Sequence, residues 1–185
     1  MPARDQISLG ILAGGQGSRL GFADKPALEF RGQALLTRAL ASAGSGFDQM
    51  LLSNNGSDPR NKRPGLAWVG DLRPQATGPL AGIESLLCTA TAPWLLTLPV
   101  DLRELQPWVI DALCNAADGP AAIVDGDGLQ PLVALWKVSE ARPAVAAALD
   151  EGQGAVHLVI RQLQMTLFDI SPHRLGNLNT PRDFD

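Results

Sequence analysis

A short apolar run followed by closely spaced glycines is the feature that most constrains this chain. Residues Ile7–Leu12 are expected to form a buried strand, and the glycines that follow it are Gly14, Gly15 and Gly17. Glycines after a strand allow the backbone to approach a ligand closely and turn several N–H groups toward one point. Arg19 and Lys25 add positive charge to the same segment. The combination predicts a binding site for a polyphosphate.

The two best-known glycine loops do not match this segment. The sequence has no Gly-Lys-Ser/Thr, which a P-loop requires. A dinucleotide-binding loop reads G-x-G-x-x-G, whereas Gly15 and Gly17 are followed by Gly21, one residue late. A flexible connection between a strand and a helix, with incidental basic residues, is the alternative interpretation. Arg19 and the neighbouring Asp-Lys-Pro sequence at 24–26 favour a binding site over that alternative.

Strand and helix signals alternate along the chain. Apolar runs typical of strands cover residues 7–12, 49–52, 66–69, 94–100, 121–124, 131–136 and 165–170. Apolar residues recur at helical spacing over residues 34–43, 79–89, 107–117, 140–149 and 155–162. Between two of the strands, Asp-Gly-Asp-Gly at 125–128 indicates a hairpin-like turn. The order predicts a three-layer α/β/α fold with a mainly parallel, Rossmann-like sheet, which binds ligands at the carboxyl ends of its strands.

Length, charge and cysteine content narrow the class of protein further. The 185 residues are most simply one domain, residues 1–185. A formal net charge of −4 argues against a nucleic-acid partner, which requires a basic surface. Without a membrane-length apolar stretch or a signal-peptide pattern, we expect no membrane association and a cytoplasmic location. Cys88 and Cys114 lie in apolar helical patterns without metal-ligand spacing, and we expect buried, reduced thiols.

Polar residues follow the expected strands at the edge where a ligand would bind. They are Ser53 and Asn55 after the second strand, Asp71 after the third, and Asp101 after the apolar run at 94–100. A carboxylate at the end of a buried strand is costly unless it is paired. Mg²⁺, held by one or two carboxylates and by substrate phosphates, is one possible partner for Asp101. A capping or turn role for Asp101, paired with Arg103, is the alternative.

The motifs together resemble those of a known family. LAGGQGSRLGFADK at 12–25 resembles the LAGG-x-x-x-R-x-G-x-x-D-K signature of the molybdenum cofactor guanylyltransferases (MobA) and of the nucleotidyltransferase superfamily around them. GPLAG at 78–82, Gln-Pro at 130–131 and NLNTP at 177–181 also resemble that family, in the same order. GPLAG and NLNTP are more specific than LAGG, and the resemblance extends over nearly the whole chain. It implies a fold of the nucleotide-diphospho-sugar transferase type.

The resemblance also implies a reaction and a set of site residues. The reaction is transfer of GMP from GTP to the phosphate of molybdenum-bound molybdopterin, with release of pyrophosphate and with Mg²⁺ as cofactor. The residues implied to bind the nucleotide are Leu12, Ala13, Gly14, Gly15, Lys25, Ser53, Asn55, Asp71 and Asp101. Those implied to be catalytic are Arg19, Lys25 and Asp101, with Asp101 as the metal ligand. Residues implied to face the pterin are Gly78, Gly82, Asn177 and Asn179. For the glycines of GPLAG, close packing at a helix start is an equal alternative.

The sequence departs from the family pattern beside the expected metal ligand. Family members commonly continue this motif as Asp-x-Pro, whereas here Asp101 is followed by Leu-Arg-Glu-Leu-Gln-Pro. Ser53 stands where many relatives have Asn. Two alternatives therefore remain open: a related enzyme that uses CTP or another phosphate acceptor, and a catalytically weak homologue that binds the cofactor and delivers it. The expected partners are GTP and molybdopterin, with transient contact to molybdopterin-insertion proteins or apo-molybdoenzymes.

Overall fold

A seven-stranded sheet forms the centre of the computed structural model, in the order β5-β4-β1-β6-β8-β7-β9. The structure describes residues 2–13, 24–56, 58–73, 78–116 and 119–184. The strands are β1 Ile7–Leu12, β4 Gln49–Ser53, β5 Leu66–Val69, β6 Trp94–Pro99, β7 Ala121–Asp125, β8 Gly128–Lys137 and β9 Thr166–Asp169. Strands β5, β4, β1 and β6 are mutually parallel, β9 is parallel to β7, and β8 is antiparallel to both of its neighbours. The predicted mainly parallel sheet is confirmed.

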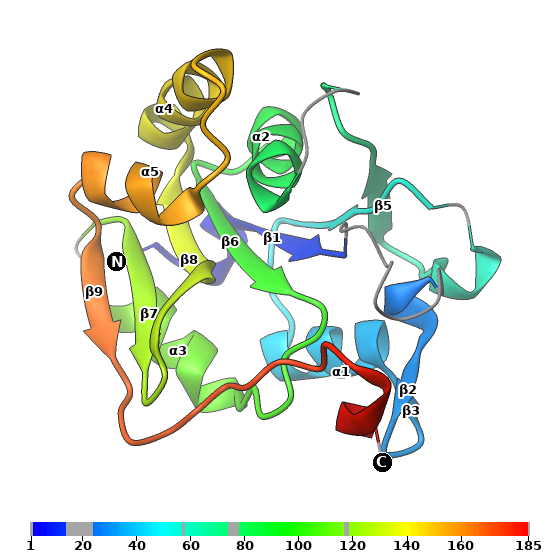
Figure 1. Cartoon of the computed structure of the whole chain (residues 1–185). Helices are drawn as coiled ribbons and strands as arrows, with labels where there is room; N and C mark the ends of the chain where they lie inside the picture. Colours follow the sequence, from blue (N-terminus) through cyan, green and yellow to red (C-terminus); the bar gives the residue numbers. More distant parts are fainter. Residues whose placement is uncertain (1, 14–23, 57, 74–77, 117–118, 185) are drawn as a thin grey trace.

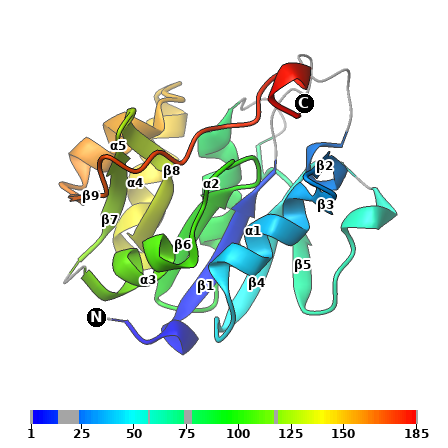
Figure 2. The same cartoon turned by 90° about the horizontal axis from the view of Figure 1, so that it is seen from below.

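Helices cover both faces of the sheet (Figures 1 and 2). Helices α1 Leu35–Ala43 and α3 Pro107–Ala116 pack on one face. The other face is covered by α2 Pro79–Thr89, α4 Val138–Asp150 and α5 Val156–Gln162. Each face has its own apolar core, because strands buried on both sides present apolar side chains in both directions. The result is the α/β/α arrangement expected from the alternating pattern.

Helix α2 lies unusually close to the central strand. Residues 80–87 are all buried, since the helix packs on the sheet and against α4. Gly10 in β1 permits this approach, because a Cβ there would lie 2.8 Å from Leu86 Cδ1. This contact holds the last turn of α2 against β1, and the close approach of Gly82 to Leu12 holds the first half of α2 at the carboxyl end of β1. That end of the sheet is where the sequence places the ligand.

Most elements occur where the sequence predicts them, with ends that differ by at most three residues, the largest difference being the start of β8 at Gly128 instead of 131. Strands β7 and β8 form the expected hairpin across 125–128. An additional hairpin of two-residue strands, β2 Glu29–Phe30 and β3 Gln33–Ala34, was not predicted, because such short strands carry no periodicity. The expectation for Cys88 was wrong, since its side chain is exposed on α2. Cys114 is buried as expected, and burial raises the pKa of its thiol to about 11.

The C-terminal segment, red in Figure 1, passes below β7 and β6 in that view and ends beside the β2–β3 hairpin, as Figure 2 also shows. The end of the chain is fixed there by an edge-to-face contact between Phe184 and Phe30, whose ring centroids are 6.2 Å apart. Within the described residues, none of the helices has the length and apolar character needed to cross a membrane.

Candidate active site

Four parallel strands end at one edge of the sheet and bring the predicted site residues together. Backbone hydrogen bonds continue the strand pairing just past the strand ends: Ala13 N–H donates to Ser53 O at 3.0 Å, and Val100 N–H donates to Leu12 O, also at 3.0 Å. Asn54 N–H donates to Val69 O at 3.1 Å. The loops after β1, β4, β5 and β6 therefore begin side by side. Gly14, Gly15 and Arg19 lie outside the described residues.

Lys25 and Asp101 form an ion pair at this edge. Asp101 follows β6 and is buried, and its Oδ2 accepts a hydrogen bond from Lys25 Nζ. Lys25 belongs to η3, a short 3-10 turn at Lys25–Ala27 that is anchored by the buried side chain of Pro26. The alternative pairing of Asp101 with Arg103 is not formed, because the Arg103 guanidinium lies over the Phe30 ring, 5.7 Å from its centroid. Two side chains expected to act on the triphosphate are thus in direct contact.

Asn55 and Asp71 orient each other across the loops after β4 and β5. Asn55 Nδ2 donates to Asp71 Oδ2 at 2.6 Å, and Asp71 N–H donates back to Asn55 Oδ1 at 3.0 Å. The reciprocal bonds fix the amide and the carboxylate in one arrangement at the surface. Ser53, the last residue of β4, is by contrast buried, with 1% of its surface exposed. The polar surface available to a ligand here is supplied by Asn55 and Asp71.

A second polar cluster surrounds Asp24, the residue before Lys25. Its carboxylate accepts hydrogen bonds from Asn61 Nδ2 at 2.8 Å and from Asn54 Nδ2 at 3.4 Å. Asn54 Oδ1 in turn accepts from Gly56 N–H at 2.9 Å. Asn54 was expected at the site only as part of the loop at 53–55, and neither Asp24 nor Asn61 was assigned a role there. Asp24 lies within the Asp-Lys-Pro sequence at 24–26 and within the family signature, whereas the buried Asn61, which ends the 3-10 turn at 59–61, had no sequence signal.

The C-terminal turn lies against the loop that follows Asp101. Leu178 N–H donates to Asp101 O at 2.9 Å, and Asn177 pairs with Leu102 in an isolated antiparallel bridge. Asn179 N–H donates to Asp183 Oδ2 at 2.8 Å, which shapes the turn. Asn177 is thereby placed next to the Asp101 loop although it is far away in sequence. Part of the NLNTP sequence thus contacts the candidate site directly.

The glycines of GPLAG have different surroundings. Gly78 precedes α2 with a φ of +95°, a backbone conformation that residues other than glycine rarely adopt. Gly82 is buried, and a Cβ there would lie 2.7 Å from Ser53 Oγ and 3.2 Å from Leu12 Cδ2. Close packing of α2 on the ends of β1 and β4 accounts for Gly82. For Gly82, the structure therefore supports the interpretation that glycine is needed for close packing of the helix.

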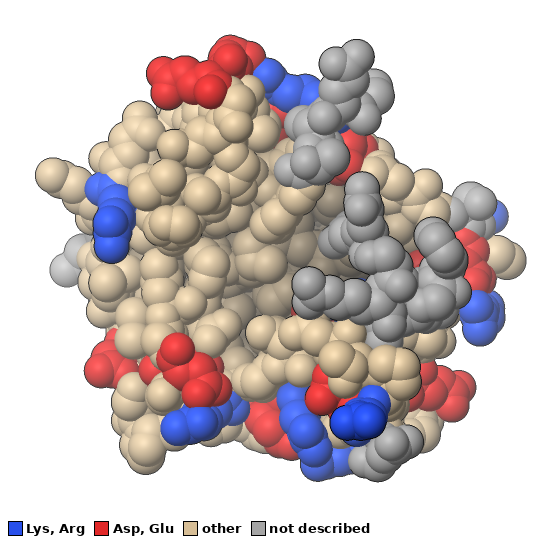
Figure 3. Space-filling model, in the orientation of Figure 1, with Lys and Arg blue, Asp and Glu red and all other residues tan. Residues whose placement is uncertain are grey.

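This edge of the sheet is suited to binding a metal–phosphate complex. Among the described residues, the groups at this edge include one buried carboxylate, one ammonium and an oriented amide–carboxylate pair. In the described parts of the chain, no three His, Cys, Asp or Glu side chains form a metal-binding group. A single carboxylate fits Mg²⁺, which takes waters and phosphate oxygens as its remaining ligands. Figure 3 shows Lys and Arg in separate places along the rim of this face, interspersed with Asp and Glu.

Comparison with known proteins places the chain among nucleotidyltransferases. The model of a MobA-like NTP transferase domain matches residues 9–166. A molybdenum cofactor guanylyltransferase of Photobacterium profundum is 30% identical over 188 residues, covering 99% of this chain and 96% of the relative. One of Aliivibrio fischeri is 32% identical over 185 residues, covering 97% and 94%.

Solved structures share the fold. Molybdopterin-guanine dinucleotide biosynthesis protein A from Archaeoglobus fulgidus superposes with a TM-score of 0.75 at 22% identity, covering 96% of this chain and 94% of that one. A 2-C-methyl-D-erythritol 4-phosphate cytidylyltransferase from Thermus thermophilus gives a TM-score of 0.68 at 17% identity, covering 95% and 94%. The nucleotidyltransferase type of α/β fold is confirmed.

Proposed function

Because this chain belongs to the MobA-like NTP transferase domain family, we propose that it is a molybdenum cofactor guanylyltransferase. It transfers GMP from GTP to the phosphate of molybdenum-bound molybdopterin. The products are molybdopterin guanine dinucleotide and pyrophosphate. Full-length relatives with this activity in their names support the assignment, since they align over more than nine-tenths of both chains.

The reaction requires positioning more than covalent chemistry. An oxygen of the cofactor phosphate attacks the α-phosphorus of GTP, the bond from that phosphorus to the β-phosphate oxygen breaks, and pyrophosphate leaves with the electron pair. The protein supplies no nucleophile. Its task is to align the two phosphates and to neutralise the charge that builds up between them. The loops at the carboxyl edge of the sheet have the charges and the backbone proximity that this task needs.

The Lys25–Asp101 ion pair is the main observation that supports the roles we assign to these two side chains. Each side chain of the pair has an alternative partner in a nucleotide–metal complex: phosphate oxygens for Lys25, and the metal for Asp101. Exchange of partners avoids leaving an unpaired charge at a buried position. Enzymes of this family generally use a divalent metal, and we assign it as Mg²⁺ with Asp101 as the protein ligand. When bound, Mg²⁺ would neutralise charge on the triphosphate and its leaving group.

The remaining roles follow from position along the sheet edge. We assign backbone groups of Leu12, Ala13 and Gly14 to holding the nucleotide, and Gly15 and Arg19 to the triphosphate. Asn55 and Asp71, which orient each other, contact the base or ribose, with the buried Ser53 supporting this region from the end of β4. The pterin side comprises Gly78, Gly82, Asn177 and Asn179. For Gly82, its packing against Ser53 means that it shapes this region without lining it.

Turnover with purified nucleotides tests the function. The protein is incubated with Mg²⁺, molybdenum-loaded molybdopterin and each of the four nucleoside triphosphates, and pyrophosphate and dinucleotide products are quantified. We expect equimolar products with GTP and at least tenfold lower kcat/KM with CTP. A preference for CTP would indicate the related cytidylyltransferase activity instead. Cofactor binding without any turnover would indicate a delivery protein.

Three broader statements complete the proposal. Residues 1–185 form one catalytic domain, as the continuous seven-stranded central sheet supports. The protein acts in the cytoplasm, where its two free cysteines suit a reducing compartment. Its small-molecule partners are GTP and molybdopterin, and its protein partners are molybdopterin-insertion proteins or apo-molybdoenzymes, contacted transiently. It binds neither nucleic acid nor membranes.

A further inference from the structure

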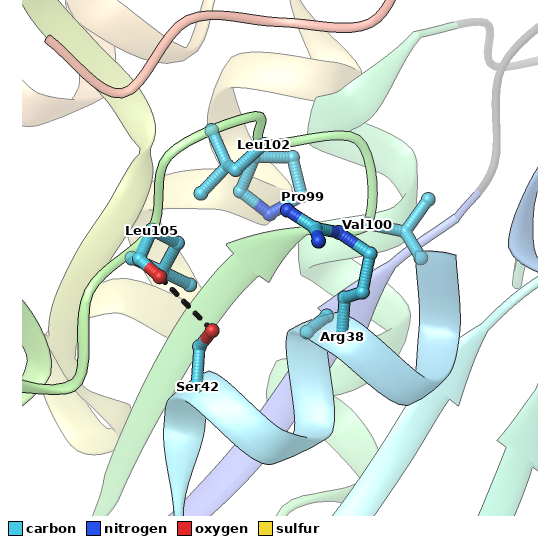
Figure 4. Close-up of a pocket in the computed structure, with 7 residues that line it drawn as sticks. Arg38, Ser42, Pro99, Val100, Leu102 and Leu105 are labelled. Atoms are coloured by element: carbon cyan, nitrogen blue, oxygen red, sulfur yellow. Dashed lines mark hydrogen bonds between the residues drawn. The ribbon is translucent and has the colours of Figure 1, made fainter. Parts of the chain in front are cut away.

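The loop that follows Asp101 is hydrogen-bonded both to helix α1 and to the C-terminal segment. We infer that Arg38 and Ser42 of α1 are positioning residues for the Asp101 carboxylate. The inference rests on the proposed role of Asp101 as the metal ligand. Neither Arg38 nor Ser42 lies in the sequence motifs through which this chain resembles the family. Both line a small hollow between α1 and residues 99–105 (Figure 4).

Helix α1 holds the loop by its carbonyl oxygens. Arg38 Nη2 donates to Arg103 O at 2.9 Å, and Ser42 Oγ donates to Leu105 O at 3.0 Å. Figure 4 shows the Ser42 bond and the Arg38 side chain extended along the loop toward Pro99 and Leu102. One turn of helix thus holds two carbonyls that lie two residues apart. Such spacing fixes both the distance and the rotation of the loop relative to α1.

The Arg38 guanidinium is itself fixed in place. Its central carbon lies 4.9 Å from the centroid of the buried Phe30 ring, within the range of a cation–π contact. Its Nε is buried, and no hydrogen-bond partner for it occurs among the described residues. A buried donor without a partner is unfavourable, so the conformation is maintained by the ring and by the bond to Arg103 O. Because the Arg38 side chain is held in one conformation, it can hold the loop in a fixed orientation, which an incidental surface contact would not do.

The C-terminal segment holds the same loop from the opposite direction. Arg103 N–H donates to Gly176 O at 3.2 Å, and Glu104 N–H donates to Leu175 O at 2.9 Å. At the front of the loop, Asp101 O accepts from Leu178 N–H. The amides therefore point to the C-terminal segment and the Arg103 and Leu105 carbonyls point to α1. An irregular loop gains a defined path when its backbone groups are satisfied in this way.

The fixed loop determines where the Asp101 carboxylate points. Asp101 lies between the end of β6 and the loop, so rotation of the loop backbone would move its carboxylate relative to Lys25. Displacements of about 1 Å are sufficient to lower turnover by about a hundredfold in well-organised sites. Most bonds from the C-terminal segment are formed by backbone atoms, which any residue supplies, although His173 Nε2 also lies 3.1 Å from Glu104 O and Arg31 pairs with the Glu104 carboxylate at 3.3 Å. Arg38 and Ser42 are the side-chain contributions from α1, and substitution removes them selectively.

Arg38→Met, Arg38→Lys and Ser42→Ala test the inference, with Arg142→Met as the matched control. Met keeps an unbranched stem over Phe30 without donors, whereas Lys restores a cation and a donor. Arg142 also donates to a backbone carbonyl, Leu87 O, at 2.7 Å, but it joins α4 to the far end of α2. The first readout is Mn²⁺ affinity in the presence of GTP, measured by electron paramagnetic resonance. The second is amide hydrogen exchange over residues 101–105.

We expect Arg38→Met to weaken Mn²⁺ binding by about tenfold and to speed exchange over the loop, and Ser42→Ala to have a smaller effect in the same direction. Arg38→Lys should recover part of the affinity, and Arg142→Met should match the parent protein. Equal Mn²⁺ affinity in Arg38→Met and Arg142→Met would overturn the inference and leave the proposed function intact. A parent protein that binds no Mn²⁺ with GTP would overturn the metal site together with this inference. Normal metal binding without GTP turnover would contradict the proposed function alone.

Discussion

Two buried aspartates at the ends of β6 and β7, strands that β8 separates in the sheet, are held in different ways. Asp125 ends β7 and is 3% exposed, and Asp101 follows β6 and is 9% exposed. Three neutral N–H groups surround Asp125: Leu175 N–H at 2.9 Å, Asp127 N–H at 2.8 Å and Gln130 Nε2 at 3.0 Å. Asp101, in contrast, has a single side-chain partner in the described structure, the ammonium of Lys25.

This difference suggests a structural role for the Asp125 carboxylate and leaves the Asp101 carboxylate able to exchange its partner. Burial alone would raise the pKa of Asp125, but the hydrogen bonds from Leu175, Gln130 and Asp127 outweigh burial and keep its pKa below the ordinary value of 3.8. These donors come from fixed backbone and from a neighbouring side chain, so Asp125 is bound to the turn that it stabilises. The partner of Asp101 is a lysine with a flexible stem, and under the proposed function this lysine turns to phosphate when a metal ion takes the carboxylate.

Substitution of Asp101 should have the largest effect. Asp101→Asn preserves shape and removes the charge, and we expect turnover to fall by about 10³-fold, or about 4 kcal/mol. GTP affinity measured without metal should change far less, because the ion acts mainly on charge that develops during transfer. Turnover as a function of Mg²⁺ concentration is the measurement.

A capping role for Asp101 predicts the opposite result. Asn caps nearly as well as Asp, so activity and its magnesium curve would then be unchanged. Asp71→Asn is the comparison variant, since Asp71 is the next carboxylate along the sheet edge. Loss of magnesium dependence in Asp71→Asn, with normal behaviour in Asp101→Asn, would move the metal site to Asp71.

Substitution of Asp125 should affect folding rather than chemistry. Asp125→Ala leaves three buried donors without an acceptor, and we expect the free energy of unfolding to fall by about 3 kcal/mol. At a temperature where the variant is folded, kcat should stay within about threefold of the parent value. Urea unfolding and steady-state kinetics measure the two quantities. Asp169→Ala is the control, because Asp169 also accepts a backbone hydrogen bond, from Ser171 at 2.8 Å, but is exposed.

Loss of the Lys25 ammonium should have an intermediate effect on binding. In Lys25→Ala we expect GTP affinity or turnover to fall by about tenfold, equivalent to about 1.4 kcal/mol. Lys62→Ala is the matched control, since Lys62 is an exposed lysine at the end of the neighbouring 3-10 turn at 59–61. Equal kinetics for the two variants, both well folded, would remove Lys25 from the phosphate site.

The fold could be predicted from the sequence because it depends on periodicity and turn chemistry. Apolar runs located the sheet strands, and the glycine-rich turn at 125–128 located the β7–β8 hairpin. Burial of Asp125 could not be predicted, because Leu175, which covers it, lies 50 residues further along the chain. The exposure of Cys88 was also missed, since a thiol in an apolar helical pattern gives no indication of which side of the helix is covered.

The candidate site could be predicted only at the level of strand ends. Parallel strands bring their carboxyl ends to one edge, so Ser53, Asp71 and Asp101 could be grouped without coordinates. Direct pairing of Lys25 with Asp101 depends on how the chain returns after the glycine segment, which local sequence does not encode. Arg38 and Ser42 carried no signal at all, because a polar face on a helix is normally the solvated one.

The smallest expected effect is a change in how stability responds to acid, and it sharpens the contrast between the two aspartates. The folded pKa of Asp125 is below its unfolded value, so the carboxylate stabilises the fold above about pH 4, and this contribution is lost as pH falls through the folded pKa. Asp125→Asn removes one acceptor oxygen and the charge at every pH. The difference in unfolding free energy between the parent protein and Asp125→Asn should therefore be about 1 kcal/mol or more at pH 7 and should shrink toward pH 3. All other titrating groups are shared by the two proteins and cancel in the comparison. Urea unfolding at both pH values gives the difference. A gap that stays constant with pH would mean that the three N–H donors do not favour the charged form, and that Asp125 differs from Asp101 only in position.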